Sequence, residues 1–260
     1  MKRFFNDLKK YWKYIVYRTK ADLKAEVTGS YLSWLWLIIE PICFMLIYTF
    51  ISVIVFHSKI QYFTAFVFIG LTIWEFFQKT LTSSVRIVKN NRDVVTKVYI
   101  PKWVLLMCRA SVNMVKFFIS FALVLITMIM YHIPITFNVL YFIPLVFILF
   151  IFTFGISCIF LHFGVFIEDL QNLTTIGLRM LFYMSGVFFA LSTKTSGSLT
   201  SILSKINPLA VFITESRNAL IYCSSINILL VLIWTIISII LCCIGVKTIY
   251  KYENTYAKVM

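Results

Sequence analysis

The stretch AEVTGSYLSWLWLIIEP, residues 25–41, lies where a basic segment gives way to a long apolar run. Residues 1–30 carry eight Lys and Arg side chains, whereas the run 31–56 carries none. A helix needs about 20 mostly apolar residues to cross a bilayer. The stretch therefore predicts a basic segment on one side of a membrane that leads into a first membrane span.

The composition supports a membrane protein. Of the 260 residues, 61% are hydrophobic and only 13% are charged. A soluble domain carries about 25% charged residues, so this chain has more apolar surface than a soluble core of its size would bury. A lipid bilayer is the solvent that such a surface requires.

Six apolar runs are long enough to be spans, and none alternates with the period of a strand. The sequence thus predicts an all-α integral membrane protein in which residues 1–260 form one transmembrane domain. We do not expect a cleavable signal peptide at the N-terminus, because about thirty mostly polar and charged residues come before the first run. The predicted spans are 31–56, 60–78, 104–131, 139–167, 173–193 and 225–246.

The distribution of positive charge predicts the orientation. Residues 1–30, 79–109 and the stretch from 247 onwards together hold 18 of the 24 Lys and Arg residues. Short segments rich in Lys and Arg stay in the cytoplasm, which places both termini there after six spans. The net charge of +14 is then mostly a collar beside anionic membrane lipids, and nucleic acid is not expected as a partner.

The basic N-terminal segment has the pattern of a helix. Phe4, Leu8, Tyr11, Trp12 and Ile15 recur at helical spacing with lysines between them. An amphipathic helix of this kind lies in the membrane interface. The alternative is a solvated basic arm that only fixes the topology.

The segment between the second and third spans, KTLTSSVRIVKNNRDVVTKVYIPKWVLLMCR (79–109), is longer than a plain connection requires. It predicts a short cytoplasmic helix, a polar break around residues 90–93, and a third span that begins at Pro101. Such a segment is typical of a docking surface. The alternative is a helix that rests on lipid headgroups. The predicted apolar face consists of Val85, Val88, Val94, Val95 and Val98.

A second short helix is predicted outside the membrane, within residues 191–224. Asn207-Pro208 is a good helix start, with Asn as the N-cap and Pro at the first helical position. Leu209, Phe212, Ile213 and Leu220 share one face, and we expect Glu215 and Arg217 to lie away from it. Its role is either that of a gate or that of a surface helix with no part in transport.

Charged residues inside spans are costly and mark functional sites. Glu40, Glu75 and Arg179 are the candidates, whereas we expect Arg109 and Lys116 to reach the inner headgroups. The six cysteines form no CxxC pair and the three histidines lie far apart. We therefore expect no metal site, catalytic site or cofactor.

Several stretches in this order and spacing make the chain resemble the permease subunit of type-2 ABC exporters, in the branch that exports O-antigen, capsule and teichoic-acid polysaccharides. The resemblance covers nearly the whole chain. The stretches are LKAEVTGSYLSWLWLIIEP (23–41), FIGLTIWEFF (68–77), NNRDVVTKVYIPKW (90–103), FGVFIEDL (163–170) and INPLAVFITESRNAL (206–220).

The resemblance implies an assembly of two permease copies with two ATP-binding subunits. This chain has no GxxxxGK[ST] phosphate loop, so ATP hydrolysis is expected from the separate partner. The substrate would be a lipid-linked glycan that moves from the cytoplasmic to the outer side. The residues that would couple the permease to the ATPase are Val88, Asn90, Asn91, Arg92, Asp93, Lys97, Tyr99, Glu168 and Asp169.

The resemblance also implies a wide path between the two copies, and sugar rings stack on aromatic faces. Aromatic side chains at span ends are also common interface anchors, which is the alternative for most of these residues. The candidates for the path are Trp34, Trp36, Glu40, Tyr48, Trp74, Glu75, Phe77, Arg179, Phe182 and Tyr183, and those for an outer gate are Asn207, Pro208, Phe212 and Arg217.

Three other functions stay open at this point. A drug or antibiotic exporter of the same class would share the architecture. A proton-coupled transporter would use Glu40 and Glu75 as proton carriers, but it leaves the cytoplasmic segment unexplained. A membrane-embedded enzyme needs clustered acids, bases or metal ligands. The ten carboxylates here are scattered, and Glu168-Asp169 is the only adjacent pair.

Overall fold

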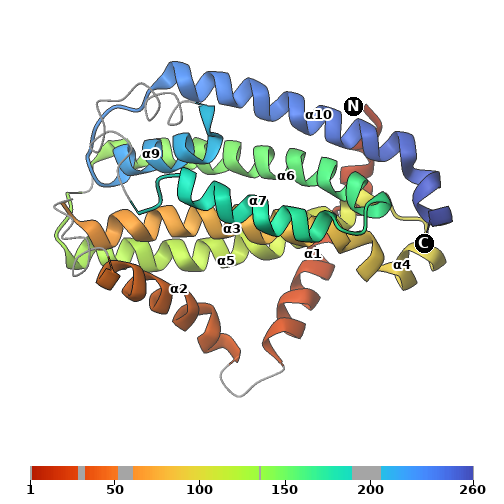
Figure 1. Cartoon of the computed structure of the whole chain (residues 1–260), viewed down its shortest axis with the longest axis horizontal. Helices are drawn as coiled ribbons and strands as arrows, with labels where there is room; N and C mark the ends of the chain where they lie inside the picture. The colour runs from red at the N-terminus through yellow and green to blue at the C-terminus, as the bar shows by residue number, and fades with distance from the viewer. Residues whose placement is uncertain (1, 29–32, 52–60, 135, 189–205, 260) are drawn as a thin grey trace.

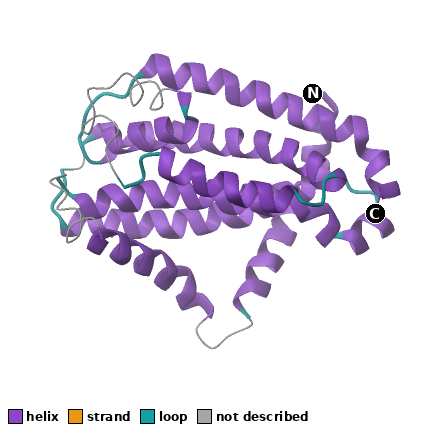
Figure 2. Ribbon diagram, viewed as in Figure 1, coloured by secondary structure: helices purple, strands orange, loops and turns teal. Residues whose placement is uncertain are grey.

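A computed structural model describes residues 2–28, 33–51, 61–134, 136–188 and 206–259. Every regular element in this part of the chain is a helix, and no strand occurs in it (Figure 2). The all-α prediction is therefore confirmed. The elements are α1 (Lys2–Val27), α2 (Ser33–Phe50), α3 (Phe63–Asn90), α4 (Arg92–Lys97), α5 (Lys102–Met130), the 3-10 helix η2 (Phe137–Tyr141), α6 (Phe142–Phe166), α7 (Leu170–Met184), α9 (Pro208–Leu220) and α10 (Ile228–Val259).

Three stretches of the described helices are long and apolar enough to cross a membrane: Lys102–Met130, Phe137–Phe166 and Ile228–Tyr256. They correspond to the third, fourth and sixth predicted spans. The other predicted spans contain α2, whose apolar part Leu35–Ile47 is shorter, the first part of α3, and α7. The count of six spans stays a prediction, and parts of the first, second and fifth lie outside the described residues.

The long helices form a bundle from which one pair projects (Figure 1). Helices α3, α5 and α6 run side by side, α10 packs along α6, and α7 and α9 lie against α3. Helices α1 and α2 form a V whose two limbs reach the bundle at separate places. We call this pair the V. Helix α1 contacts α5, and α2 contacts α3 and α5.

The most extensive contact between the described helices joins α6 and α10, and it depends on two glycines. A Cβ at Gly155 would lie 2.6 Å from the backbone nitrogen of Cys242, and one at Gly245 would lie 2.7 Å from the carbonyl oxygen of Gly155. Small residues at such crossings let helix backbones approach, and dispersion between the close backbones then stabilises the pair in lipid. A side chain at either position would push the two helices apart.

Helix α1 is formed as predicted, and its apolar face packs on the bundle. Ile15 is buried, and Phe4, Leu8 and Tyr11 pack against the same apolar cluster around Trp103. Trp12, which the helical spacing had placed on that face, is 58% exposed. Four of the five predicted residues therefore share one apolar face, which meets the bundle, and Trp12 was placed wrongly. The position of α1 in the membrane interface stays a prediction.

Helix α3 continues well beyond the predicted second span and ends at Asn90. The first half of the predicted cytoplasmic segment is therefore part of one 28-residue helix, and only α4 is separate. Val85, Val88 and Val95 are buried as expected. Val98 follows the last residue of α4 in an extended conformation and is 55% exposed, so its place on the apolar face was wrong.

Candidate functional site

The break between α3 and α4 is held by Asn91. Its Nδ2 donates to the carbonyl oxygen of Ile87 at 2.8 Å, and its Oδ1 accepts from Arg18 Nη2 at 3.3 Å. Arg18 is itself paired with Asp22, with 2.8 Å between Nε and Oδ1. The start of α4 is therefore tied to α3 and to α1 at once.

The predicted coupling residues gather at one end of the molecule, where α4, the α6–α7 turn and the C-terminus lie (Figure 1). Val88 is buried and Asn91 is half-buried, so these two residues lie beneath the exposed members of the set. Lys89 Nζ lies 3.9 Å from Glu168 Oε1, which brings the α6–α7 turn beside the end of α3. The exposed members are Asn90, Arg92, Asp93, Lys97, Tyr99, Glu168 and Asp169.

A network at the same end was not predicted from the sequence. Arg3 Nη2 on α1 donates to the Tyr99 hydroxyl at 2.8 Å and to Glu253 Oε2 on α10 at 3.2 Å. The Tyr250 hydroxyl donates to Asp7 at 2.7 Å and accepts from Trp103 Nε1 at 2.9 Å. Both termini are thus joined to the chain that follows α4. Residues this far apart in sequence leave no local signal of such a network.

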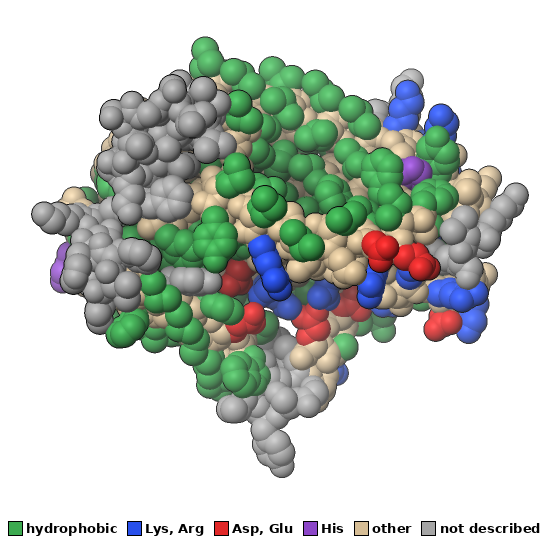
Figure 3. All heavy atoms as spheres, in the orientation of Figure 1, with side chains coloured by type: hydrophobic (Ala, Val, Ile, Leu, Met, Phe, Trp, Pro, Cys, Tyr) green, Lys and Arg blue, Asp and Glu red, His purple; other side chains and the backbone are tan. Residues whose placement is uncertain are grey.

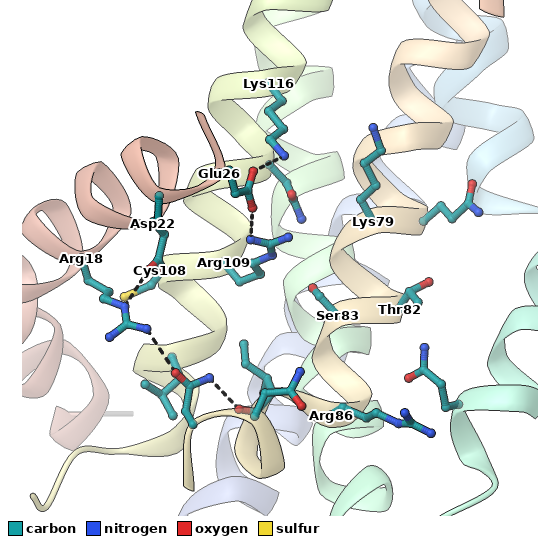
Figure 4. A pocket seen from close by; sticks show the side chains of 18 residues that line it. Arg18, Asp22, Glu26, Lys79, Thr82, Ser83, Arg86, Cys108, Arg109 and Lys116 are labelled. Carbon is teal, nitrogen blue, oxygen red and sulfur yellow. Dashed lines mark hydrogen bonds and ion pairs between the residues drawn. The ribbon is translucent and has the colours of Figure 1, made fainter. Parts of the chain in front are cut away.

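A cavity of about 740 Å³ lies between α1, α3, α5 and α7 (Figure 4). Lys79, Ser83 and Arg86 line it from α3, and Arg109 and Lys116 line it from α5. The space-filling view shows Lys, Arg, Asp and Glu side chains in the notch between the V and the bundle, below a face that is mostly hydrophobic (Figure 3). The sequence did not predict this cavity, because its walls come from four separate helices.

The carboxylate of Glu26, in the last turn of α1, forms ion pairs with both Arg109 and Lys116. Burial raises the pKa of Glu26, but the hydrogen bonds and charges of Lys116 and Arg109 outweigh it and lower the pKa below its usual value. The two cations had been expected to reach lipid headgroups. They bind a carboxylate of the protein instead.

Glu40 and Glu75 also have a cationic partner. Lys79 Nζ lies 3.1 Å from Glu40 Oε1 on α2 and 3.2 Å from Glu75 Oε2 on its own helix. Both carboxylates predicted at membrane depth therefore share one lysine.

The aromatic candidates for a path lie in different surroundings. Trp74 and Phe77 are buried in the bundle, where Trp74 packs on Phe182 with ring centroids 5.1 Å apart. Trp36 and Tyr183 are exposed, as is Arg179 on the outer face of α7. The side chains of Trp34 and Tyr48 lie outside the described residues. A path lined by these residues stays a prediction.

The outer helix α9 begins as predicted. Asn207 is its N-cap and accepts from the backbone N–H of Leu209 at 3.0 Å, and Pro208 follows at the first position. Its surroundings differ from the prediction. Glu215 and Arg217 are buried like Leu209 and Phe212, because the bundle covers α9 on more than one side. The placement of Glu215 and Arg217 away from the buried face was therefore wrong.

Arg217 holds three elements together. Its guanidinium donates to the carbonyl oxygens of Phe66, Gly186 and Val187 at 3.0, 2.8 and 2.8 Å. It also stacks on the Phe66 ring, with Cζ 3.4 Å from the centroid. Burial lowers the pKa of Arg217 to about 9, so it keeps its charge at neutral pH. Gly70 makes room for it, because a Cβ there would lie 2.6 Å from Nη2.

Comparison with known proteins gives three relatives with one function in their names. The chain is 29% identical over 222 residues to the O-antigen export system permease protein RfbA of Myxococcus xanthus, a match that covers 85% of both chains. Two Klebsiella pneumoniae proteins of the same name are 27% and 28% identical over 250 residues, which is 95% of this chain and 94% of theirs. No family model matches the chain.

The resemblance to polysaccharide-export permeases is confirmed. The two longer matches leave only a few residues of this chain uncovered, so the similarity is not confined to apolar spans. A chain of apolar helices alone matches many unrelated membrane proteins in composition. Similarity to such permeases over nearly the full length is a stronger argument, because it includes the polar segments.

Proposed function

We propose that this chain is the transmembrane subunit of an ATP-driven exporter that moves a lipid-linked polysaccharide from the cytoplasmic to the outer side of the bacterial inner membrane. The observation that carries the proposal is its similarity to three O-antigen export permeases over 85% to 95% of its length. Three helices long enough to cross a membrane support the location.

Energy would enter at the end that carries α4. A separate ATP-binding subunit would dock on the exposed side chains of Asn90, Arg92 and Asp93, with Lys97, Tyr99 and the Glu168-Asp169 turn beside them. Docking surfaces of this kind combine exposed polar groups with a rigid support. Asn91 supplies the support, since it joins α4 to α3 and to Arg18 of α1. Both termini would lie on this cytoplasmic side.

The glycan would pass between this chain and a second copy of it. Exposed aromatic and charged side chains on α2 and α7, such as Trp36, Arg179 and Tyr183, are available to line that path. At the outer end, Asn207, Pro208, Phe212 and Arg217 hold α9 against the bundle and would form a gate.

The test is to purify the tagged chain in mild detergent from the cells that naturally make it, and to assay ATPase activity in whatever co-purifies. A variant with Asn90, Arg92 and Asp93 all changed to Ala should lose the partner or its permease-dependent ATPase activity. A matched control changes three exposed α1 residues, Asn6, Lys9 and Lys13, to Ala and should keep both.

One result would support the proposed function, and two others would contradict it. If the ATP-binding subunit co-purifies with the wild type and the control but not with the coupling variant, the exporter and its docking surface are supported. If no nucleotide-binding subunit co-purifies in several detergents, or if cells without this chain still display their surface polysaccharide, the proposed function is wrong.

A further inference from the structure

Each limb of the V also has one carboxylate that is paired with the bundle, in addition to its packing contacts. Glu26, at the end of α1, forms ion pairs with Arg109 and Lys116 of α5. Glu40, on α2, forms one with Lys79 of α3. These side chains are between 23% and 45% exposed, so the pairs are weak enough to be exchanged for another anion.

The three cations that hold the V are also wall residues of the 740 Å³ cavity. Figure 4 shows Glu26 bridging Arg109 and Lys116 on one side, with Lys79, Ser83 and Arg86 on the other. The wall contains five Lys or Arg residues, including Arg18 and Arg86, against two carboxylates, Asp22 and Glu26, and two more carboxylates outside the wall, Glu40 and Glu75, pair with Lys79. No described carboxylate lies within ion-pair distance of Arg86, so the wall has cationic charge that the protein does not neutralise.

The cavity also contains a buried amide with one unused end. Asn113 is 2% exposed, and its Nδ2 donates to Thr80 Oγ1 at 3.0 Å. Its Oδ1 has no hydrogen-bond partner among the described residues. A buried polar atom without a partner is costly, so this position favours a ligand that supplies a hydroxyl group. Ser83 and Thr82 add hydroxyl groups to the same wall.

Cations arranged with hydroxyl and amide groups suit a phosphate ester that also carries hydroxyls. Phosphate oxygens accept charge-assisted hydrogen bonds from Arg and Lys. A glycerol or sugar hydroxyl would donate a hydrogen bond to the unpartnered Oδ1 of Asn113. A phosphate with two charges is a better partner for Arg109 and Lys116 than the single charge of Glu26. The ligand and Glu26 therefore cannot both use these cations fully.

We infer that this cavity binds a phosphate-bearing headgroup, and that binding displaces Glu26 and Glu40 from Arg109, Lys116 and Lys79. This loosens the last turn of α1 and the attachment of α2, while the apolar face of α1 stays packed on the bundle. The two carboxylates act as an internal latch that occupies the cations until an anion replaces them. The physiological meaning of this latch rests on the proposed function, but binding and release require neither the ATP-binding subunit nor transport.

The first experiment measures anion binding to the purified chain without any ATP-binding subunit. It uses isothermal titration calorimetry with inorganic pyrophosphate at constant ionic strength. Glu26→Gln removes the competing charge and should raise the affinity about three- to tenfold. Lys116→Met should lower it. Asp7→Asn makes the same charge change near the start of α1, outside the cavity wall, and it should leave the affinity at the wild-type value.

The second experiment follows the V by hydrogen exchange of the full chain. Pyrophosphate should speed exchange in residues 18–28 and 35–47 of the wild type, and Glu26→Gln should exchange fast in 18–28 without it. Nanodiscs in which cardiolipin, whose headgroup has two phosphates and a hydroxyl group, replaces phosphatidylcholine distinguish a lipid headgroup from a free phosphate. A site for a lipid headgroup would loosen the V in these nanodiscs when no soluble anion is added, whereas a site for a free phosphate would not.

Three results would overturn the inference. One is the absence of saturable binding of either probe. Another is an affinity of Glu26→Gln no higher than that of Asp7→Asn, which would show that Glu26 does not compete with the anion. The third is binding that leaves exchange in the V unchanged. If the chain exports polysaccharide but the anion does not displace Glu26, this inference is wrong and the proposed function stands. If the anion displaces Glu26 but no polysaccharide is exported, the proposed function is wrong and this inference stands.

Discussion

Arg217→Met tests whether one buried guanidinium holds the outer helix in place. Arg217 is 3% exposed and donates three hydrogen bonds to carbonyl oxygens on α3 and on the turn after α7. Met keeps most of the apolar length of the side chain and removes the charge and all three bonds. We expect α9 to lose its attachment to Phe66 and Val187, and the whole chain to become less stable.

The size of the loss follows from two opposing effects. Three hydrogen bonds from a charged donor contribute about 5–9 kcal/mol before any offset. Removing a buried charge recovers a desolvation penalty of several kcal/mol, so about 2–4 kcal/mol remains. For a chain of this size that lowers the unfolding temperature by roughly 5–15 °C.

The assay is thermal unfolding in detergent, followed by a thiol-reactive dye that reports exposure of the buried Cys108 and Cys158. Arg179→Met is the matched control, since Arg179 lies exposed on α7, and it should shift the midpoint by no more than about 2 °C. Gly70→Ala should act like Arg217→Met, because its methyl group would lie 2.6 Å from Arg217 Nη2. If Arg217→Met unfolds at the temperature of the control, the guanidinium does not join these elements and the reasoning fails.

Three further predictions concern other contacts. Gly155→Leu should abolish a monodisperse peak in size-exclusion chromatography because it separates α6 from α10, whereas Gly177→Leu, which has open space around its Cβ, should not. Asn207→Ala should remove the N-cap of α9 and lower stability by about 1–2 kcal/mol, measured as the unfolding temperature. The pKa of Glu26 is lowered by Lys116 and Arg109 despite its burial, so its stabilisation is complete above its unfolded pKa and lost as pH falls through the lower folded one. The unfolding temperatures of the wild type and Glu26→Gln should therefore converge between pH 6 and pH 3, and a constant difference would contradict the ion pairs.

Local chemistry was predictable from the sequence, as the two ends of α9 illustrate. Asn207-Pro208 identified the helix start, because the cap bond to Leu209 and the fixed φ of proline depend only on neighbouring residues. The far end was not predictable in the same way. Helical spacing separates an apolar from a polar face, and it assumes that the polar face meets solvent. In α9 that face meets the bundle, so Glu215 and Arg217 are buried.

The cavity illustrates a second limit. Sequence alone identified Arg109 and Lys116 as unusual, since charged residues in an apolar run require an explanation. It assigned them to lipid headgroups, because their partner Glu26 lies at the end of a different helix, 83 residues from Arg109. Pairing over that distance depends on how α1 packs on α5, and no periodicity within either helix records it.

Helix α3 connects the two ends where function is proposed. Near its start, the carbonyl oxygen of Phe66 accepts from Arg217, and its last turn is joined through Ile87 and Asn91 to α4. The helix has 28 residues without an internal proline, so it spans about 42 Å as one rod. Sharp kinks in helices usually occur at proline, and α3 contains none. A push on α4 would therefore displace α9 and the wall that carries Lys79 together, which links the coupling end, the cavity and the outer helix through one element.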